Sequence, residues 1–355
     1  MQKKFWLQAA CLFLLAISCT ACGTEKSYEH SAVVMDTVVT LSASGPEAKA
    51  AVDESFERLA ALEAMASSTV ETSDASKLKA AAGHSYVKLH PEIYHMLEVS
   101  QEYSRLSGGA WDVTAGPLVE LWGVGTDHER LPAPEEVEAA RRLVSWQQLY
   151  LRPEDQSAML GREGMSVDFG GIAKGMAIDE VRKIYAAHNI RNGLINMGAS
   201  SLYGMGTNKD GKPWNVGIRH PRNDAKDTYL GIVSLEDMVL STSGDYERCF
   251  FADGKRYHHI LDPATGYPAD NGAMSDTVVI DGSLPDSGMI SDLLTTAVFV
   301  MGPEKGRAFL EELPEKVQGE VTGTEDILYP ADGFEKKLRG LHEDFHWADS
   351  KPEAE

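Results

Sequence analysis

The sequence predicts an α+β fold, in which helices and strands are mixed without regular alternation. Apolar residues at helical spacing predict amphipathic helices, and short apolar runs bounded by turn residues predict strands between them. The chain shows no strict strand-helix repetition and no internal repeat, which disfavours a doubly wound parallel sheet. After an N-terminal leader, about 330 residues remain, enough for one large domain or two ordinary ones.

Helical periodicity predicts each helix in chain order. The first opens after Gly45-Pro46 and has four apolar residues on one face: Val52, Phe56, Leu59 and Leu62. The second carries Ile93, Met96 and Leu97 and ends by Gly108-Gly109. We expect further helices near 134–143, 172–188 and 290–301. Short apolar runs predict strands near 149–151, 194–197, 214–218, 231–233 and 277–280.

The loop 206–213 has the glycine and lysine spacing of a phosphate-binding P-loop. It ends in Pro213, where the magnesium ion of a P-loop needs a hydroxyl, and it lies between two strand-like runs rather than before a helix. We therefore expect a hairpin loop here.

The N-terminus has the composition of an export signal. Lys3 and Lys4 precede an apolar run from Phe5 to about Ser18, which is short for a membrane span and ends among small residues. The segment 18–23 resembles a bacterial lipobox, so we expect residues 1–21 to be a lipoprotein signal peptide and Cys22 to carry the lipid. Cys19 is the alternative lipid site, and an ordinary cleaved signal is the alternative to lipidation.

Cysteine content and charge limit the rest of the chain. Of the four cysteines only Cys249 lies beyond the signal peptide and the expected lipid site, so the body cannot form an intramolecular disulfide and depends on its core. The formal charge is -21, and losing Lys3 and Lys4 with the leader makes it more negative still. Such a surface repels nucleic acid, and we expect no nucleic-acid partner. A phosphorylated ligand needs a cation, or local lysines and arginines, to reverse the field.

Two distant segments suggest where such a ligand binds. Residues 167–175 place Asp168, two glycines and Lys174 where a strand is expected to turn into a helix, which offers an anion backbone N–H groups and a lysine. Asp292 and Thr296 are four residues apart, hence on one helix face, as two oxygen ligands for a hard cation. Taken alone, this pair is equally consistent with a polar stripe on an apolar helix. Together the segments suggest a metal-assisted site for a phosphorylated ligand.

Further motifs occur in a fixed order along the chain. They are Met35-Asp36-Thr37, Gly109 to Thr114, Val167 to Gly175, Leu194 to Gly198, Trp214 to Ile218, Ser241 to Tyr246, His259 to Gly266 and Ser291 to Ala297. This set resembles the ApbE family of FAD:protein FMN transferases, which split FAD and attach its FMN half to a threonine or serine of a target protein. The resemblance implies a T-fold-related α+β architecture of two lobes, with mixed sheets and the flavin site between the lobes.

The resemblance also implies a division of the chain and roles for particular residues. Residues 22–32 are expected to be a tether, 33–340 the transferase domain and 341–355 an acidic polar tail. Mg²⁺ is expected on Asp292, the Thr296 hydroxyl and the Gly171 carbonyl, an all-oxygen set. Seven residues match positions that line the FAD site of relatives: Met35, Ala110, Trp111, Asp112, Asp168, Lys174 and Ile260.

His259 is the expected acceptor of the proton from the attacking hydroxyl, because it matches a family histidine and imidazole titrates near neutral pH. Asp262 either orients it or opens a turn. Asp292, as the metal-bound acid, is the other catalytic residue. The expected partners are FAD, an exported or membrane-bound electron-transfer flavoprotein with a threonine or serine acceptor, and the membrane itself, through the lipid on the extracytoplasmic face.

Two other functions share most of these residues. A magnesium-dependent FAD pyrophosphatase would use water as the nucleophile and release FMN and AMP. A non-catalytic flavin-binding lipoprotein would not need Asp292 and Thr296.

Overall fold

A nine-stranded sheet forms the centre of the molecule. The computed structural model describes residues 26–348 except 224, 226–227 and 315. The strand order is β1-β2-β6-β7-β10-β13-β14-β15-β17, antiparallel throughout except for the last pair. These strands are β1 (Ser27–Val34), β2 (Thr37–Ser44), β6 (Asn192–Met197), β7 (Ser201–Met205), β10 (Met238–Gly244), β13 (Ala273–Asp281), β14 (Val317–Gly323), β15 (Ile327–Ala331) and β17 (His346–Trp347).

The described residues also form three smaller sheets. Strands β8 (Trp214–Arg219), β9 (Tyr229–Leu235) and β16 (Leu338–Arg339) form one, in the order β16-β9-β8. Strands β3 (Val87–Lys88), β4 (Leu149–Arg152) and β5 (Ser157–Leu160) form another, in the order β3-β5-β4. Strands β11 (Cys249–Ala252) and β12 (Lys255–His258) pair as a hairpin.

The helices begin at residues that suit a helix start. Pro91, Pro134 and Pro303 occupy the first turns of their helices, where the missing N–H of proline has no cost. Ser73 caps another helix by accepting a hydrogen bond from the Ser76 N–H at 3.0 Å. The α-helices are α1 (Ala48–Ala66), α2 (Asp74–Ala81), α3 (Pro91–Leu106), α4 (Gly116–Trp122), α5 (Pro134–Arg141), α6 (Ala173–Ala187), α7 (Ser287–Met301) and α8 (Pro303–Glu312).

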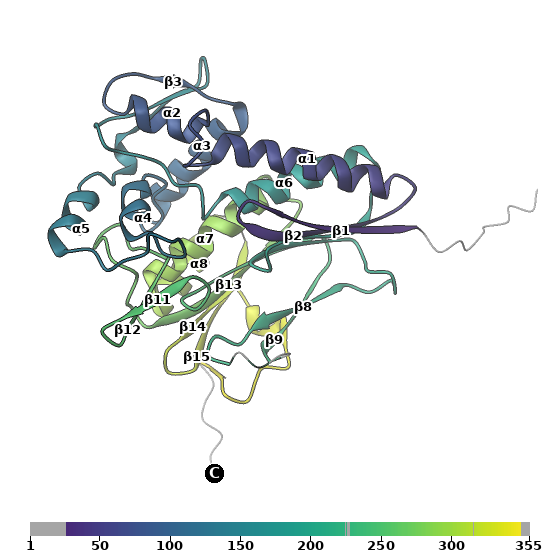
Figure 1. Ribbon diagram of the computed structural model, residues 1–355. Coiled ribbons are helices and arrows are strands. Elements are labelled where there is room, and N and C mark those ends of the chain that lie inside the picture. Colours follow the sequence, from purple (N-terminus) through teal and green to yellow (C-terminus); the bar gives the residue numbers. More distant parts are fainter. Residues whose placement is uncertain (1–25, 224, 226–227, 315, 349–355) are drawn as a thin grey trace, which may run out of the picture.

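Both faces of the large sheet are covered, and the alternation of its side chains shows how. On β13, Val278 and Ile280 belong to the main core with α6 and α7, whereas Val279 belongs to a second core on the other face. That second core includes Val233 of β9 and Phe334. The sheet is therefore sandwiched between helices on one face and the β16-β9-β8 sheet on the other (Figure 1).

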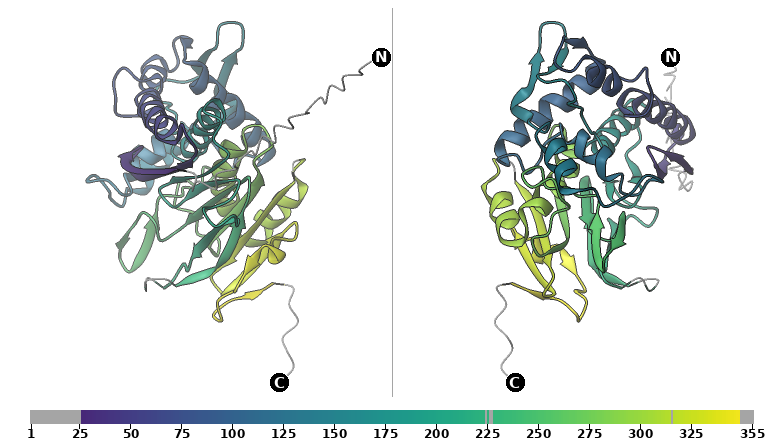
Figure 2. Two further views of the ribbon diagram at one scale, coloured as in Figure 1. Left: turned by 90° about the vertical axis from the view of Figure 1, so that its right-hand side faces the viewer. Right: turned by 60° about the vertical axis from the view of Figure 1, so that its left-hand side comes forward.

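The main core continues from the sheet into the helical end of the molecule. It joins residues of β2, β6 and α7 to residues of α2, α3, β4 and β5. In both views of Figure 2 the N-terminal helices, in purple and blue, lie above the strands of the C-terminal half, in green and yellow. The α+β class is confirmed by this architecture. The division into two lobes is not confirmed, because one core runs through both parts.

Apart from the strand expected to lead into residues 167–175, every helix and strand predicted from the sequence is present within a few residues of its expected limits. The loop 206–213 is not a hairpin loop, and that prediction is wrong. It connects β7 to β8, which belong to different sheets, so its ends do not pair with each other. Its backbone closes locally instead, with the Asn208 N–H donating to the Lys212 carbonyl at 2.8 Å.

The expected tether and tail both extend too far into the folded chain. Strand β1 begins at Ser27 and pairs with β2 over its full length, so residues 27–32 belong to the sheet. At the other end, Phe345 is buried in the second core and β17 pairs with β15. Apolar burial and strand pairing hold both segments in place.

The predicted signal peptide and the candidate lipid sites Cys19 and Cys22 lie outside the described residues. Within the described part of the chain, no helix combines the length and apolar character needed to cross a bilayer.

Candidate functional site

The segment 167–175 leads into α6 as an extended stretch rather than as a strand. Only an isolated bridge between Ser166 and Ala115 precedes it. Hydrogen bonds of Asp168, rather than strand pairing, fix the path of the backbone here. The Asp168 N–H donates to the Val113 carbonyl at 2.8 Å, and its carboxylate accepts from the Gly170 N–H at 2.9 Å. The expected strand is therefore absent, but the turn into the helix is present.

Asp292 lies on α7 directly opposite the start of α6. Its side chain is buried, with a residue exposure of 4%. The Gly175 N–H donates to Oδ2 at 3.0 Å, and the Ser201 hydroxyl donates to Oδ1 at 2.9 Å. Lys174 Nζ lies 3.5 Å from Oδ1. These donors give the buried carboxylate a fixed orientation, and each oxygen retains a further lone pair for a cation.

Two glycines allow α6 and α7 to approach closely enough for this contact. A Cβ at Gly175 would lie 2.2 Å from the Gly288 carbonyl oxygen, and a Cβ at Gly288 would lie 2.3 Å from the Gly175 carbonyl oxygen. Asp179 of α6 strengthens the same junction by accepting from the Gly288 and Met289 N–H groups at 3.1 Å each. The backbone contact fixes where Asp292 sits.

The other two expected metal ligands meet in the same place. A Cβ at Gly171 would lie 2.9 Å from Thr296 Oγ1 and 2.8 Å from the ring of Trp111, so only glycine fits there. Trp111 is buried, and its indole N–H has no hydrogen-bond partner among the described residues. The structure thus brings together Gly171, Asp292 and Thr296, whose donors are all oxygen atoms and fit a hard cation such as Mg²⁺.

Lys174 connects this oxygen cluster to further charged groups. Besides Asp292, it donates to the Gly170 carbonyl at 3.2 Å. Burial raises the pKa of Asp168, while the Gly170 N–H and the charges of Lys174 and Arg248 oppose that rise. The positive charges of Lys174 and Arg248 also lower the pKa of His259. Two cations therefore stand beside the turn, as a phosphorylated ligand requires in an acidic protein.

The His259 ring is held by Arg248. The Arg248 carbonyl accepts from the His259 N–H at 3.1 Å and lies 3.3 Å from His259 Nδ1. Because a carbonyl only accepts, the ring proton is on Nδ1, and Nε2 is free to take a proton. The side chain is solvent-accessible but crowded by protein atoms. That loss of solvation, with the charges of His258, Lys174 and Arg248, lowers the pKa of His259, so the ring is neutral at pH 7.

Asp262 does not orient His259. Its carboxylate accepts from the Ala264 N–H at 2.8 Å and its carbonyl accepts from the Gly266 N–H at 2.7 Å, which is the turn alternative. His258 is buried and lies 3.0 Å from the Ala269 carbonyl through Nε2. Of the two adjacent histidines, only His259 has a nitrogen available to a ligand.

The other four residues expected to contact the flavin differ in their burial and in their hydrogen bonds. Asp112 is buried and accepts from Thr114 N–H, Thr114 Oγ1 and Trp146 N–H at 2.8, 2.6 and 2.9 Å, so its carboxylate organises its own loop. Met35 lies at the β1-β2 turn with a positive φ of 55°. Ile260 is buried in the main core. Ala110 is half-buried beside Trp111. Flavin contact by these four residues stays a prediction.

Sequence reasoning missed two side chains of the site. Arg248 donates to the Asp36 carbonyl at 3.3 Å, which ties the β1-β2 turn to the His259 segment. It lies two residues beyond the Ser241 to Tyr246 motif. Its positive charge is the feature of the sequence that could have identified it as a site residue. Ser201, the first residue of β7, holds Asp292. Nothing in its local sequence distinguishes it from other strand serines.

The chain matches one family of known proteins over most of its length. The profile of the ApbE family matches residues 35–319. The FAD:protein FMN transferase of Treponema pallidum is 32% identical over 322 residues, which cover 86% of this chain and 87% of that protein. The FAD:protein FMN transferase of Klebsiella pneumoniae is 31% identical over 304 residues, covering 86% and 92%.

Solved structures show the same fold. The ApbE protein of Thermotoga maritima superposes with a TM-score of 0.79 at 28% identity, covering 89% of this chain and all of that one. The flavin transferase ApbE of Vibrio cholerae gives 0.78 at 28% identity, covering 88% of this chain and all of that one. The family match spans most of the sequence and includes the α6 turn and α7. The chain belongs to the ApbE family.

Proposed function

We propose that this protein transfers the FMN moiety of FAD to a threonine or serine hydroxyl of an acceptor protein and releases AMP. The convergence of Gly171, Asp292 and Thr296, from segments more than a hundred residues apart, carries the proposal. A purely structural role for α7 requires neither the buried carboxylate of Asp292 nor a nearby position, Gly171, at which only glycine fits. The relatives named as FAD:protein FMN transferases support the choice of reaction.

Asp292, Thr296 and the Gly171 carbonyl would hold Mg²⁺, which neutralises charge on the pyrophosphate and on the departing phosphate. Lys174, held between Asp292 and the Gly170 carbonyl, adds positive charge on the same side. Arg248 adds a second cation near His259. These groups are fixed before substrate binds, which is how electrostatic catalysis avoids reorganisation during reaction.

His259 would accept the proton. The acceptor oxygen attacks the phosphorus of the FMN half, an O–P bond forms, and the bond to the AMP phosphate breaks. The hydroxyl proton passes to Nε2, which is unprotonated because Nδ1 faces the Arg248 carbonyl. Neutral imidazole at pH 7 is the form that this step needs.

The test uses purified protein, FAD, Mg²⁺ and a candidate exported flavoprotein as acceptor. We expect a fluorescent flavin that stays bound to the acceptor after denaturation, one AMP per flavin attached, and loss of both on chelation. Release of free FMN and AMP without labelled acceptor would identify a pyrophosphatase instead. Unchanged FAD would identify a flavin-binding protein without catalysis.

We also propose that the protein is a lipoprotein anchored through Cys22 at the extracytoplasmic face of the membrane. The sequence motif at 18–23 supports this location. Metabolic labelling with a lipid analogue should mark the wild type and not Cys22→Ala. Retained label in Cys22→Ala and its loss in Cys19→Ala would move the anchor to Cys19.

A further inference from the structure

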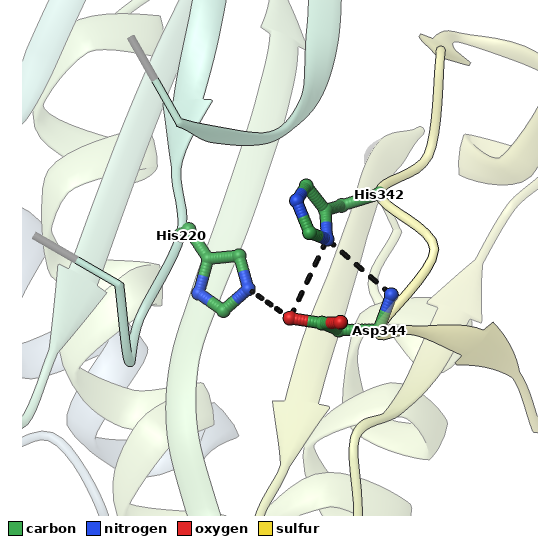
Figure 3. Close-up of side chains that lie close together, drawn as sticks. All are labelled: His220, His342 and Asp344. Atoms are coloured by element: carbon green, nitrogen blue, oxygen red, sulfur yellow. Dashed lines mark hydrogen bonds and ion pairs between the residues drawn. The ribbon is translucent and has the colours of Figure 1, made fainter. Parts of the chain in front are cut away.

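Three potential metal ligands meet on the opposite face of the large sheet from Asp292. His220 follows β8 directly, and His342 and Asp344 lie between β16 and β17. His220 Nε2 is 3.1 Å from Asp344 Oδ2, and His342 Nδ1 is 3.5 Å from the same oxygen. Figure 3 shows the two rings directed at the carboxylate from separate segments. One donor atom from each residue lies within 4.8 Å of the others.

We propose that His220, His342 and Asp344 form a second metal site, which binds a divalent transition metal such as Zn²⁺ with water as the fourth ligand. Two imidazoles and a carboxylate are donors that suit Zn²⁺ and not Mg²⁺. Metal–ligand bonds of about 2.0–2.1 Å in a tetrahedron place the ligand atoms about 3.3–3.4 Å apart. The two distances to Asp344 Oδ2 lie on either side of that value.

The contacts of His220 show how its ring is held and which proton must move before a metal ion can bind. His220 is buried, and its ring packs against Phe345 at 4.8 Å between centroids. The Arg222 N–H donates to His220 Nδ1 at 3.2 Å, so the ring proton is on Nε2 and points at Asp344. Metal binding moves this proton to Nδ1. The hydrogen bond from the Arg222 N–H to Nδ1 is then lost.

Asp344 and His342 are more accessible than His220. The Asp344 side chain is 53% exposed, which leaves an entry path and room for a water ligand. The Asp344 N–H lies 3.3 Å from His342 Nδ1, a long contact that a metal ion would replace. The negative net charge of the chain also favours cation binding.

Metal at this position would fasten the C-terminal segment to the small sheet. The His342 N–H donates to the Leu230 carbonyl at 2.8 Å, Phe345 is buried in the second core, and β17 pairs with β15. A site joining His220 to this segment links residues more than 120 positions apart. We therefore expect binding to stabilise the folded protein without taking part in flavin transfer.

Calorimetric titration of the untagged full chain with Zn²⁺, in excess Mg²⁺, tests the proposal. We expect one Zn²⁺ per chain and an affinity at least about 100-fold weaker in His342→Gln and Asp344→Asn. Asp344→Asn keeps the shape of the side chain and a hydrogen-bond acceptor but removes the charged metal ligand. A loss of Zn²⁺ affinity in this variant therefore reports metal binding rather than loss of the hydrogen bonds among the three residues. His346→Gln, close by on β17 but outside the cluster, is the matched control and should bind as the wild type does.

Thermal unfolding gives an independent readout. Zn²⁺ should raise the melting temperature of the wild type and of His346→Gln, and should leave that of Asp344→Asn and His342→Gln unchanged. All variants keep the four cysteines, so a difference between them cannot come from thiol binding. Equal Zn²⁺ affinity in all four proteins, or no Zn²⁺ binding by the wild type, would overturn the proposal. Neither result bears on flavin transfer, which is measured separately.

Discussion

At the scale of single residues, Asp292 illustrates how a buried charge is made useful. Its carboxylate has a backbone donor from α6, a hydroxyl donor from β7 and a lysine nearby, so its polar oxygens have partners although the side chain is buried. The sequence predicted the pair with Thr296 from its spacing of four residues. It could not predict Ser201, because contact between β7 and α7 is set by tertiary packing.

Asp292→Asn should abolish magnesium-dependent transfer, with a loss of at least about 10²–10³ in rate. The amide keeps the size of the side chain but removes the charge that attracts the cation. Transfer rates over a range of Mg²⁺ concentrations, with thermal unfolding to verify the fold, provide the measurement. Turnover near the wild-type level would exclude Asp292 from the metal site.

His259→Gln should slow transfer by about 10²–10⁴ and leave FAD binding largely intact. Since the pKa of His259 is lowered, its neutral base form persists as pH falls, and the wild-type rate should not drop between pH 8 and 5 through this group. His84→Gln, on an exposed loop, is the control. A rate that falls through pH 6.5 and loses that dependence in His259→Gln would contradict the assigned environment.

At the scale of elements, the junction of α6 and α7 determines whether the site exists. Periodicity predicted both helices, and the family motifs predicted that their facing ends would bind a ligand, which stays a prediction. The close approach at Gly175 and Gly288 was not predictable from the sequence, because glycine also serves turns and loops. The same limit explains loop 206–213, where turn residues revealed a connection between strands but not that the strands belong to different sheets.

Gly175→Ala should destabilise the protein by about 1–3 kcal/mol or more and reduce transfer, because the added methyl group would overlap the Gly288 carbonyl. Moving α6 also shifts the N–H that holds Asp292. Chemical denaturation and the transfer assay measure the two effects. Ala186→Ser, on the exposed side of α6, is the control. Wild-type stability and activity in Gly175→Ala would show that the helices are not in contact there.

At the scale of the whole molecule, the large sheet contains two buried acids that the proposed chemistry does not use. Asp276 on β13 and Glu320 on β14 are both inaccessible, and burial raises the pKa of each, that of Glu320 to about 7. Glu320 accepts from Thr322 at 2.8 Å through one oxygen, and its other oxygen has no hydrogen-bond partner among the described residues. The residues that flank Asp276 and Glu320 in the sequence do not predict that both acids are buried.

Glu320 should make stability depend on pH. An unfolded glutamate ionises near 4.5, whereas the folded one keeps its proton to about 7, so stability falls as pH rises from 4.5 to 7 and then levels off. Glu320→Gln should therefore be more stable than the wild type by up to about 3 kcal/mol at pH 8, with little difference at pH 4. Denaturation at both pH values, with exposed Glu325→Gln as control, checks this. An equal gain at both pH values would contradict it.

The proposed reaction depends on a divalent cation held between the α6 turn and α7. The most direct measurement is anomalous diffraction from crystals soaked with Mn²⁺, a stand-in for Mg²⁺, together with FAD. We expect a peak within about 2.0–2.3 Å of Asp292 and Thr296 side-chain oxygens and of the Gly171 carbonyl, next to the pyrophosphate. A crystal with FAD bound but with no peak there, or with the metal held by other residues, would show that Asp292, Thr296 and Gly171 do not form the metal site.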